Sequence, residues 1–306
     1  MPTEVFKSVS LALHPEAQAA LFKTSGTSNE TERGCVGYDA GGLALMDATI
    51  DTAGKAFLFP DGVEPVFLIM APPPAAVPEM VMAYGMNRLI HSFGRPESRF
   101  LIGREGFDPA GLVKALETLS TAGTPVALCG GSFGFVNFFD YCDDHGISLH
   151  LPEGSRCLDA GGFKGRSREV SREAFVERCA EKLDMPEAFS VNLLGMTEIA
   201  SQFYDNTLRN RIRGAGETPR MKVNPPWTRT QVVDADTLEP LPEGEEGLLR
   251  HLDLANRGHV LAIQTDDVGV MRNGGFEILG RAGEGEARGC SLTIDELTTA
   301  LEEKEG

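Results

Sequence analysis

Lys23-Thr24-Ser25-Gly26-Thr27-Ser28-Asn29-Glu30-Thr31-Glu32-Arg33-Gly34 is a run of small hydroxyl residues around a glycine, directly after the apolar residues 19–22. The backbone of such a loop can fold tightly around an anion, with its amides and hydroxyls pointing inward. Gly26 favours this because it can adopt torsion angles that residues with side chains avoid. A polar loop of this composition is also common on protein surfaces, so its meaning depends on the segments that follow it.

Length and composition limit the class of protein. The 306 residues predict one large domain or two unequal ones, and 42% hydrophobic with 24% charged residues is typical of a soluble folded chain. The formal charge of −17 disfavours nucleic acid and anionic membranes as partners. The sequence contains neither an apolar run of roughly 20 residues for a membrane span nor a secretory signal. Six scattered cysteines without a Cys-x-x-Cys pair favour the reducing cytoplasm over a disulfide framework or zinc site.

Between residues 66 and 189, short apolar runs alternate with longer helical patterns, which predicts an α/β sheet. The predicted strands are 66–70, 99–102 and 125–129, and the predicted helices are 78–92, 109–120, 135–144 and one from a cap at Ser171 to 183.

The pattern changes after about Gly214, where prolines interrupt the chain. Short β-type runs at 230–233, 247–251, 260–264 and 276–279 predict a small antiparallel or barrel-like β subdomain. Capping-box spacing predicts a last helix near Thr293. The expected units are a core at 1–215, a β-rich subdomain at 216–280, and a hinge with a lid stub at 281–306.

Two glycine-containing segments follow strand-like runs. Gly161-Gly162 would let a flat ring lie against exposed backbone, although a simple tight turn explains the pair as well. The segment 192–198 is expected to open a helix. Its Glu198 suits Mg²⁺ beside a polyphosphate, or serves only to favour a helix N-terminus electrostatically.

A last polar segment, 263–269, is followed by 275–281. Asp267 is placed to accept the hydroxyls of a ribose, and Arg281 can add charge-assisted hydrogen bonds to ribose or phosphate. The alternative is a polar hairpin in which Asp266 and Asp267 are turn residues.

In combination, these segments resemble the motifs of the adenylate-forming superfamily, which contains acyl-CoA ligases, luciferases and adenylation domains. The resemblance implies an α/β core of stacked mixed β-sheets with helices and a small β-barrel-like subdomain, with the C-terminal lid largely absent. It implies binding of ATP and Mg²⁺. The residues it assigns are Thr24, Ser25 and Thr27 for the leaving phosphates, Gly26 and Ser28 in the same loop, Gly161, Gly162 and Phe163 for adenine, Gly195, Met196 and Thr197 in the motif around the magnesium ligand Glu198, and Asp267 with Arg281 for ribose.

Within the superfamily, the stretches 161–169 and 288–292 resemble the acyl-protein synthetases of bacterial luminescence. The resemblance implies activation of a fatty or aryl carboxylic acid to acyl-AMP and transfer to a thiol. It also implies an acyl-CoA reductase-like or acyl-carrier partner, and a homo-oligomer is possible. Because no lid lysine matches the family pattern, the alternative is a non-catalytic or partner-dependent nucleotide-binding remnant.

Three other features leave alternatives open. Gly130-Gly131-Ser132-Phe133-Gly134 fits the nucleophile elbow of a serine hydrolase, with His251 or His259 as base and Asp234 or Asp236 as acid. One face of the predicted helix 135–144 either lines an acyl pocket or belongs to the hydrophobic core. Cys290 is structural or carries an acyl group. The residues of that helical face are Phe135, Phe138, Phe139 and Cys142.

Overall fold

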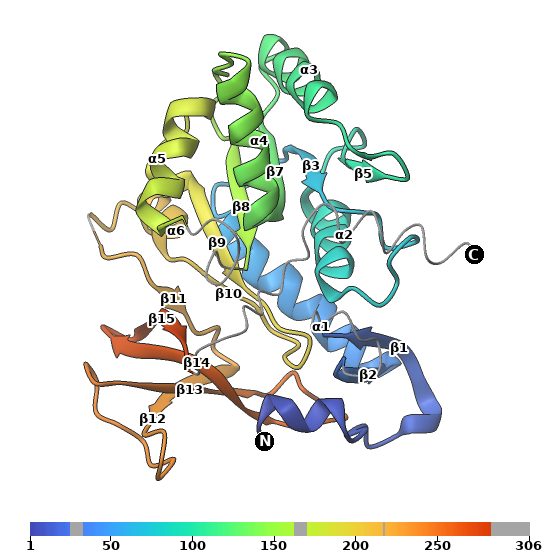
Figure 1. The fold of residues 1–306 in the computed structure, drawn as a ribbon, viewed down its shortest axis with the longest axis vertical. Helices are drawn as coiled ribbons and strands as arrows, with labels where there is room; N and C mark the ends of the chain where they lie inside the picture. The colour runs from blue at the N-terminus through green and yellow to red at the C-terminus, as the bar shows by residue number, and fades with distance from the viewer. Residues whose placement is uncertain (25–32, 162–169, 217, 283–306) are drawn as a thin grey trace.

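The computed structural model describes residues 1–24, 33–161, 170–216 and 218–282. A six-stranded sheet lies at its centre, in the order β10-β9-β8-β7-β3-β4, with every neighbouring pair parallel except β10 on β9 (Figure 1). Its strands are β3 (Val66–Met70), β4 (Arg99–Phe100), β7 (Val126–Gly131), β8 (Arg156–Ala160), β9 (Ser190–Leu194) and β10 (Phe203–Tyr204).

Helices cover both faces of this sheet, which explains why its central strands β3 and β7 are buried along their whole length and carry no polar side chain. Phe67 and Ile69 pack in one core and Val66 and Leu68 in the other, because successive side chains of a strand point to opposite faces. The first face is covered by α1 (Ala40–Ala53) and α2 (Val81–Phe93). The second is covered by α3 (Pro109–Thr121), α4 (Ser132–Asp144) and α5 (Arg172–Leu183).

The helix boundaries follow local capping chemistry. The Ser171 hydroxyl accepts a hydrogen bond from the backbone amide of Ala174, as expected for the cap of α5. Asp39 caps α1 in the same way, by accepting from the amide of Gly42. The sequence pattern did not predict α1, because Gly41 and Gly42 in its first turn have low helix propensity.

The predicted β subdomain is an antiparallel five-stranded sheet, in the order β11-β15-β14-β13-β12. Within the described residues β11 and β12 form its two edges, so the antiparallel prediction is confirmed but the barrel-like one is not: the sheet is open. Its strands are β11 (Lys222–Val223), β12 (Thr228–Val233), β13 (Glu246–Asp253), β14 (Ala262–Arg272) and β15 (Gly275–Arg281).

The remaining elements are short. The hairpin of β1 (Gln18–Lys23) and β2 (Cys35–Asp39) brackets residues 24–34, the hydroxyl-rich loop. The others are β5 (Ile102–Gly103), β6 (Gly106–Phe107), α6 (Thr207–Ile212), η1 (Thr3–Lys7), η2 (Pro15–Ala17), a π-helical turn η4 (Gly54–Leu58) and η5 (Glu187–Phe189).

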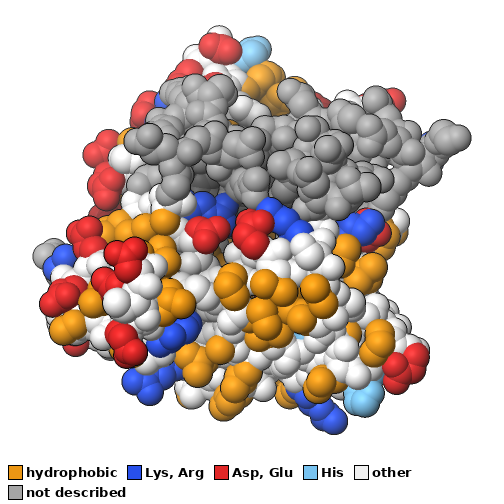
Figure 2. Space-filling view, turned by 60° about the horizontal axis from the view of Figure 1, so that its bottom comes forward, with side chains coloured by type: hydrophobic (Ala, Val, Ile, Leu, Met, Phe, Trp, Pro, Cys, Tyr) orange, Lys and Arg blue, Asp and Glu red, His pale blue; other side chains and the backbone are white. Residues whose placement is uncertain are grey.

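The helices in the described ranges are all too short or too polar to cross a bilayer. Exposed hydrophobic side chains occur on the face formed by the N-terminal segment and the five-stranded sheet (Figure 2). The largest exposed fractions there belong to Leu13 and Leu254.

Candidate functional site

A cavity that is open to solvent lies between the first face of the central sheet and helices α1 and α2. It brings together three segments that are far apart in the sequence. Lys23 and Arg33 flank the hydroxyl-rich loop, Gly161 follows β8, and the motif after β9 contributes its first residues. The predicted site residues that line this cavity are Gly161, Gly195, Met196 and Thr197.

Gly161 and Gly195 line the same cavity because of the sheet topology. β8 and β9 are parallel neighbours with Ala160 opposite Leu193, so the residues that follow them emerge at the same edge. Carboxyl ends of parallel strands are where open α/β sheets bind ligands. Gly161 has a φ of 96°, which disfavours any side chain, and a Cβ added to Gly195 would meet no atom within 4 Å. The backbone at both positions is therefore open to a ligand.

Hydrogen bonds close the base of the hydroxyl-rich loop. The amide of Thr24 donates to the carbonyl of Gly34 over 2.8 Å, and the amide of Gly34 donates to the Thr24 hydroxyl over 2.8 Å. Arg33 Nε donates to the Thr24 carbonyl, and Lys23 pairs with Glu79 at 2.9 Å. Both cations reach the cavity. The predicted residues Ser25, Gly26, Thr27 and Ser28 lie outside the described residues, as do Gly162 and Phe163.

The segment 195–202 is not the start of a helix, so that prediction is wrong. It is the loop of a hairpin in which Leu194 pairs antiparallel with Phe203. Glu198 consequently lies in this loop, and the interpretation that it favours a helix N-terminus also fails. The side chains of Met196, Thr197 and Glu198 are more than nine-tenths buried, although they are in a loop.

Side chains from three other elements hold this loop, and the sequence analysis missed them. Asn256 accepts from the amide of Ala200 and donates to the carbonyl of Glu198, over 2.8 and 2.9 Å. Asp253 accepts from the amide and hydroxyl of Ser201. The hydroxyl donors Tyr38 and Thr49 bond to the carbonyls of Thr197 and Ala200. No local pattern signals these partners, since each acts only through a distant segment.

Glu198, Asp267 and Arg281 form one electrostatic group. Asp267 and Arg281 are cross-strand neighbours on β14 and β15, with Nε and Oδ1 3.4 Å apart. Burial raises the pKa of Glu198, and the charge of Asp267 raises it further. The charge of Arg281 lowers this pKa, but it offsets only part of the rise. Burial likewise raises the pKa of Asp267 against the opposing effect of Arg281. The group therefore holds a buried carboxylate, Glu198, and a half-buried one, Asp267, with incomplete compensation by positive charge.

These carboxylates suit a divalent cation that also binds phosphate. Among the described residues, no cluster of three or more histidine, cysteine, aspartate or glutamate side chains could enclose a metal on its own. Mg²⁺ does not need one, because it is commonly bound by one or two carboxylates together with phosphate oxygens and water. Glu198, buried and incompletely compensated, fits that role.

The comparisons with known proteins agree with this geometry. The family model described as acyl-protein synthetase, LuxE, matches residues 96–299, two thirds of the sequence. This chain belongs to the acyl-protein synthetase family. A long-chain-fatty-acid–luciferin-component ligase of Vibrio harveyi is 21% identical over 212 residues, which are 66% of this chain and 53% of the relative. The chain therefore spans about half the length of the curated relatives it matches.

Solved structures show the same fold. MatB from Rhodopseudomonas palustris, in its ATP-bound form, is similar with a TM-score of 0.57 at 17% identity, over 86% of this chain and 48% of MatB. A long-chain-fatty-acid-CoA ligase from Archaeoglobus fulgidus is similar with a TM-score of 0.56 at 13% identity, over 88% of this chain and 52% of the ligase. The adenylate-forming fold predicted from the motifs is thus confirmed.

The geometry of this acyl-protein synthetase family member does not support a serine hydrolase. Ser132 does lie between β7 and α4, but it is fully buried and its hydroxyl donates to Asp159 over 2.9 Å. His251 is buried in the other sheet beside Thr230, and burial lowers its pKa to about 3. His259 packs edge-on against Tyr38. Neither histidine is bonded to Ser132.

The phenylalanine face of α4 is core and does not line an acyl pocket. Its residues are fully or almost fully buried and pack against α3, α5 and the second face of the sheet. The cavity lies on the opposite face. Periodicity alone could not decide this, because a buried helix face and a pocket wall have the same apolar spacing. Cys290 lies outside the described residues.

Proposed function

We propose that this chain performs ATP- and Mg²⁺-dependent activation of a fatty or aryl carboxylic acid to acyl-AMP and transfers the acyl group to a thiol. The observation that carries the proposal is the composition of the cavity described above. Lys23 and Arg33 line it beside the hydroxyl-rich loop, and most of its other lining residues are apolar. Family membership supports the proposal, and the curated relatives are named as long-chain-fatty-acid ligases.

In the proposed reaction, a carboxylate oxygen of the acid bonds to the α-phosphorus of ATP as the bond to pyrophosphate breaks. The thiol sulfur then bonds to the acyl carbon as the bond between that carbon and the AMP oxygen breaks, and AMP leaves with release of the thiol proton. The protein needs to align the reactants and stabilise charge on the phosphates, without a covalent step of its own. A bound Mg²⁺ would neutralise phosphate charge. Glu198 would hold this ion, and Asp267 with Arg281 would bind the ribose.

The remaining assignments follow the motifs. Thr24, Ser25 and Thr27 would hold the leaving phosphates, with Gly26 and Ser28 in the same loop. Gly161, Gly162 and Phe163 would contact adenine, next to Gly195, Met196 and Thr197. The thiol acceptor, an acyl-CoA reductase-like or acyl-carrier partner, and the division at 1–215, 216–280 and 281–306 remain predictions. So does a cytoplasmic setting, which the free thiols of Cys35, Cys129, Cys142, Cys157 and Cys179 support.

Acid-dependent ATP–pyrophosphate exchange tests the activation step. We expect Glu198→Gln to reduce exchange at least about tenfold, roughly 1.4 kcal/mol, because the neutral amide binds Mg²⁺ more weakly. Glu277→Gln, an exposed position on β15, is the matched control and should keep the wild-type rate. Exchange that is equally fast in Glu198→Gln would remove Glu198 from the site. A wild-type protein that binds ATP but exchanges no pyrophosphate with any acid would refute the proposed activity.

A further inference from the structure

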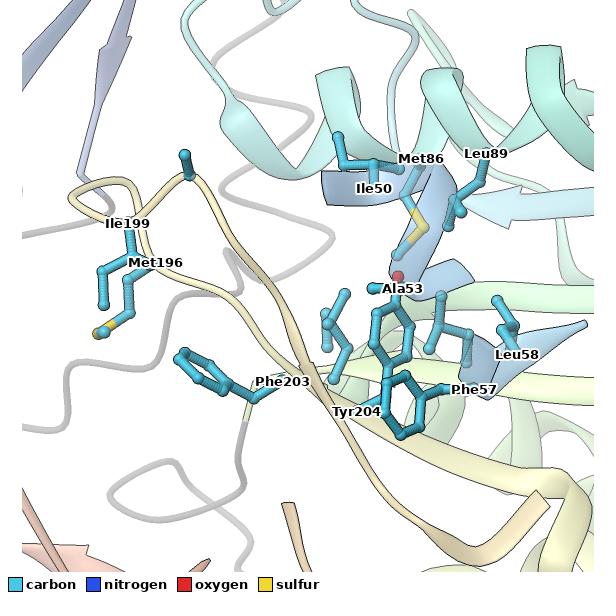
Figure 3. Packing of buried hydrophobic residues seen from close by; sticks show 14 of the residues in the cluster. Ile50, Ala53, Phe57, Leu58, Met86, Leu89, Met196, Ile199, Phe203 and Tyr204 are labelled. Carbon is cyan, nitrogen blue, oxygen red and sulfur yellow. The ribbon is translucent and has the colours of Figure 1, made fainter. Parts of the chain in front are cut away.

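The apolar end of the cavity is an arm between α1, α2 and the sheet. Met46 and Ile50 of α1 line it on one side, and residues 80–82 with Gly85, Met86 and Leu89 continue the wall. Of the described lining residues only Lys23 and Arg33 carry charge, and both flank the hydroxyl-rich loop, where Lys23 pairs with Glu79 just before the first residue of the α2 wall. In Figure 3, the side chain of Met86 points toward Tyr204 on the edge of the sheet. The arm is thus suited to a tail without polar groups.

Gly85 leaves a gap in this wall. Met82, Gly85, Met86 and Leu89 share one face of α2 by their spacing, and this face lines the arm. A Cβ added to Gly85 would meet only Ile50 Cδ1, at 3.9 Å, so the space beside it is open. Glycine inside a helix is less stable than alanine there, so helix stability does not explain it.

The rest of the wall can adapt its shape. Half of the chain's ten methionines line this cavity. Their unbranched, polarizable side chains change rotamer easily and fit ligands of varied shape. The methionines are Met46, Met80, Met82, Met86 and Met196. Methionine side chains therefore do not impose a sharp limit on the length of a bound chain. The β-branched side chain of Ile50, opposite Gly85, is stiffer.

We propose that Gly85 determines acyl-chain specificity, by leaving room opposite Ile50 for the distal part of an unbranched aliphatic chain. The side-chain volume at position 85 then sets the longest chain that the arm accepts. This inference rests on the proposed function, because it names the substrate class of the same cavity. It assigns the aliphatic acid over the aryl one.

Calorimetric titration without ATP tests the inference separately from catalysis. The ligands are hexanoate, octanoate, decanoate, dodecanoate and tetradecanoate, each below its micelle concentration. For the wild-type protein we expect the Kd to fall about fourfold for each methylene that enters the arm, which corresponds to ~0.8 kcal/mol. In Gly85→Leu this gain in affinity should stop at a shorter chain length. Hexanoate should bind as tightly as it does to wild type, and tetradecanoate at least about tenfold more weakly.

Three further variants exclude a folding artefact. Gly85→Ala should be at least as heat-stable as wild type and show an intermediate length profile, since alanine favours the helix. Gly134→Ala, in α4, and Asn87→Leu, on α2 but not in the cavity lining, repeat the chemical changes elsewhere and should keep the wild-type profile. A Gly85→Leu profile equal to wild type, or no length dependence in wild type, would overturn the inference. Length-dependent binding without pyrophosphate exchange would support it and refute the proposed activation instead.

Discussion

At the scale of single residues, the buried carboxylate of Glu198 lowers the free energy of unfolding at neutral pH. Its side chain is almost fully buried, and its pKa is raised by burial and by Asp267. Between the ordinary value of 4.5 and the raised value, the folded state binds more protons than the unfolded state. The free energy of unfolding therefore falls as pH rises through that window and stays lower above it. Under the proposed function, this charge would be retained because it binds a cation, at some expense of stability.

We therefore expect Glu198→Gln to raise the free energy of unfolding at pH 7, and this gain to vanish in acid below pH ~4, where Glu198 is protonated in both states. Urea denaturation at the two pH values measures it. Glu246→Gln, at an exposed position of β13, should change stability little at either pH. A variant that is less stable than wild type at pH 7 would contradict the assignment of an uncompensated buried charge.

At the scale of elements, the hairpin loop 195–202 has no regular structure of its own. Its geometry comes from side chains of β2, α1, and β13 with the turn after it. Asn256 is central, because it is 3% exposed and bonds both Ala200 and Glu198. Such a loop keeps Glu198 in place only while these distant partners are present.

Asn256→Ala should destabilise the protein by about 2 kcal/mol, because it leaves a buried amide and a buried carbonyl without partners. Hydrogen exchange at residues 196–201 should become faster, and denaturant unfolding should give the loss of stability. Asn210→Ala removes an amide that bonds Thr218 at the exposed surface, and should cost far less. Unchanged exchange in the loop would mean that Asn256 does not hold it.

At the scale of the whole molecule, a buried ionic network joins the two large sheets. Lys222 of β11 donates to Asn192 of β9 and to Asp205, the residue after β10. Burial opposes ionisation of Asp205, but Lys222 and Arg220 outweigh it and lower its pKa. The network thus positions the five-stranded sheet, which carries Asp267 and Arg281, against the sheet that carries the cavity.

Lys222→Met should cost about 3–5 kcal/mol, because it leaves Asp205 buried with less positive charge. Adding Asp205→Asn should recover at least about 1 kcal/mol, which a double-mutant cycle by denaturant unfolding would detect. Lys7→Met, which breaks an exposed pair with Glu4, is the control and should cost less than about 1 kcal/mol. If Lys222→Met costs no more than Lys7→Met, the network does not hold the sheets.

The sequence alone determined the elements whose signals are local. Apolar runs at 66–70 and 125–129 indicated buried strands, and Ser171 indicated the start of α5, because burial on both faces and capping act within a few residues. Gly161 was predicted to follow a strand, as it does after β8, while its assignment to adenine came from the family resemblance and stays a prediction. Only the tertiary structure decided that 195–202 is a hairpin loop, that the cavity faces α2 rather than α4, and that Gly85 borders it. These outcomes depend on which distant side chains meet, and apolar spacing indicates that a face is buried without indicating what it packs against.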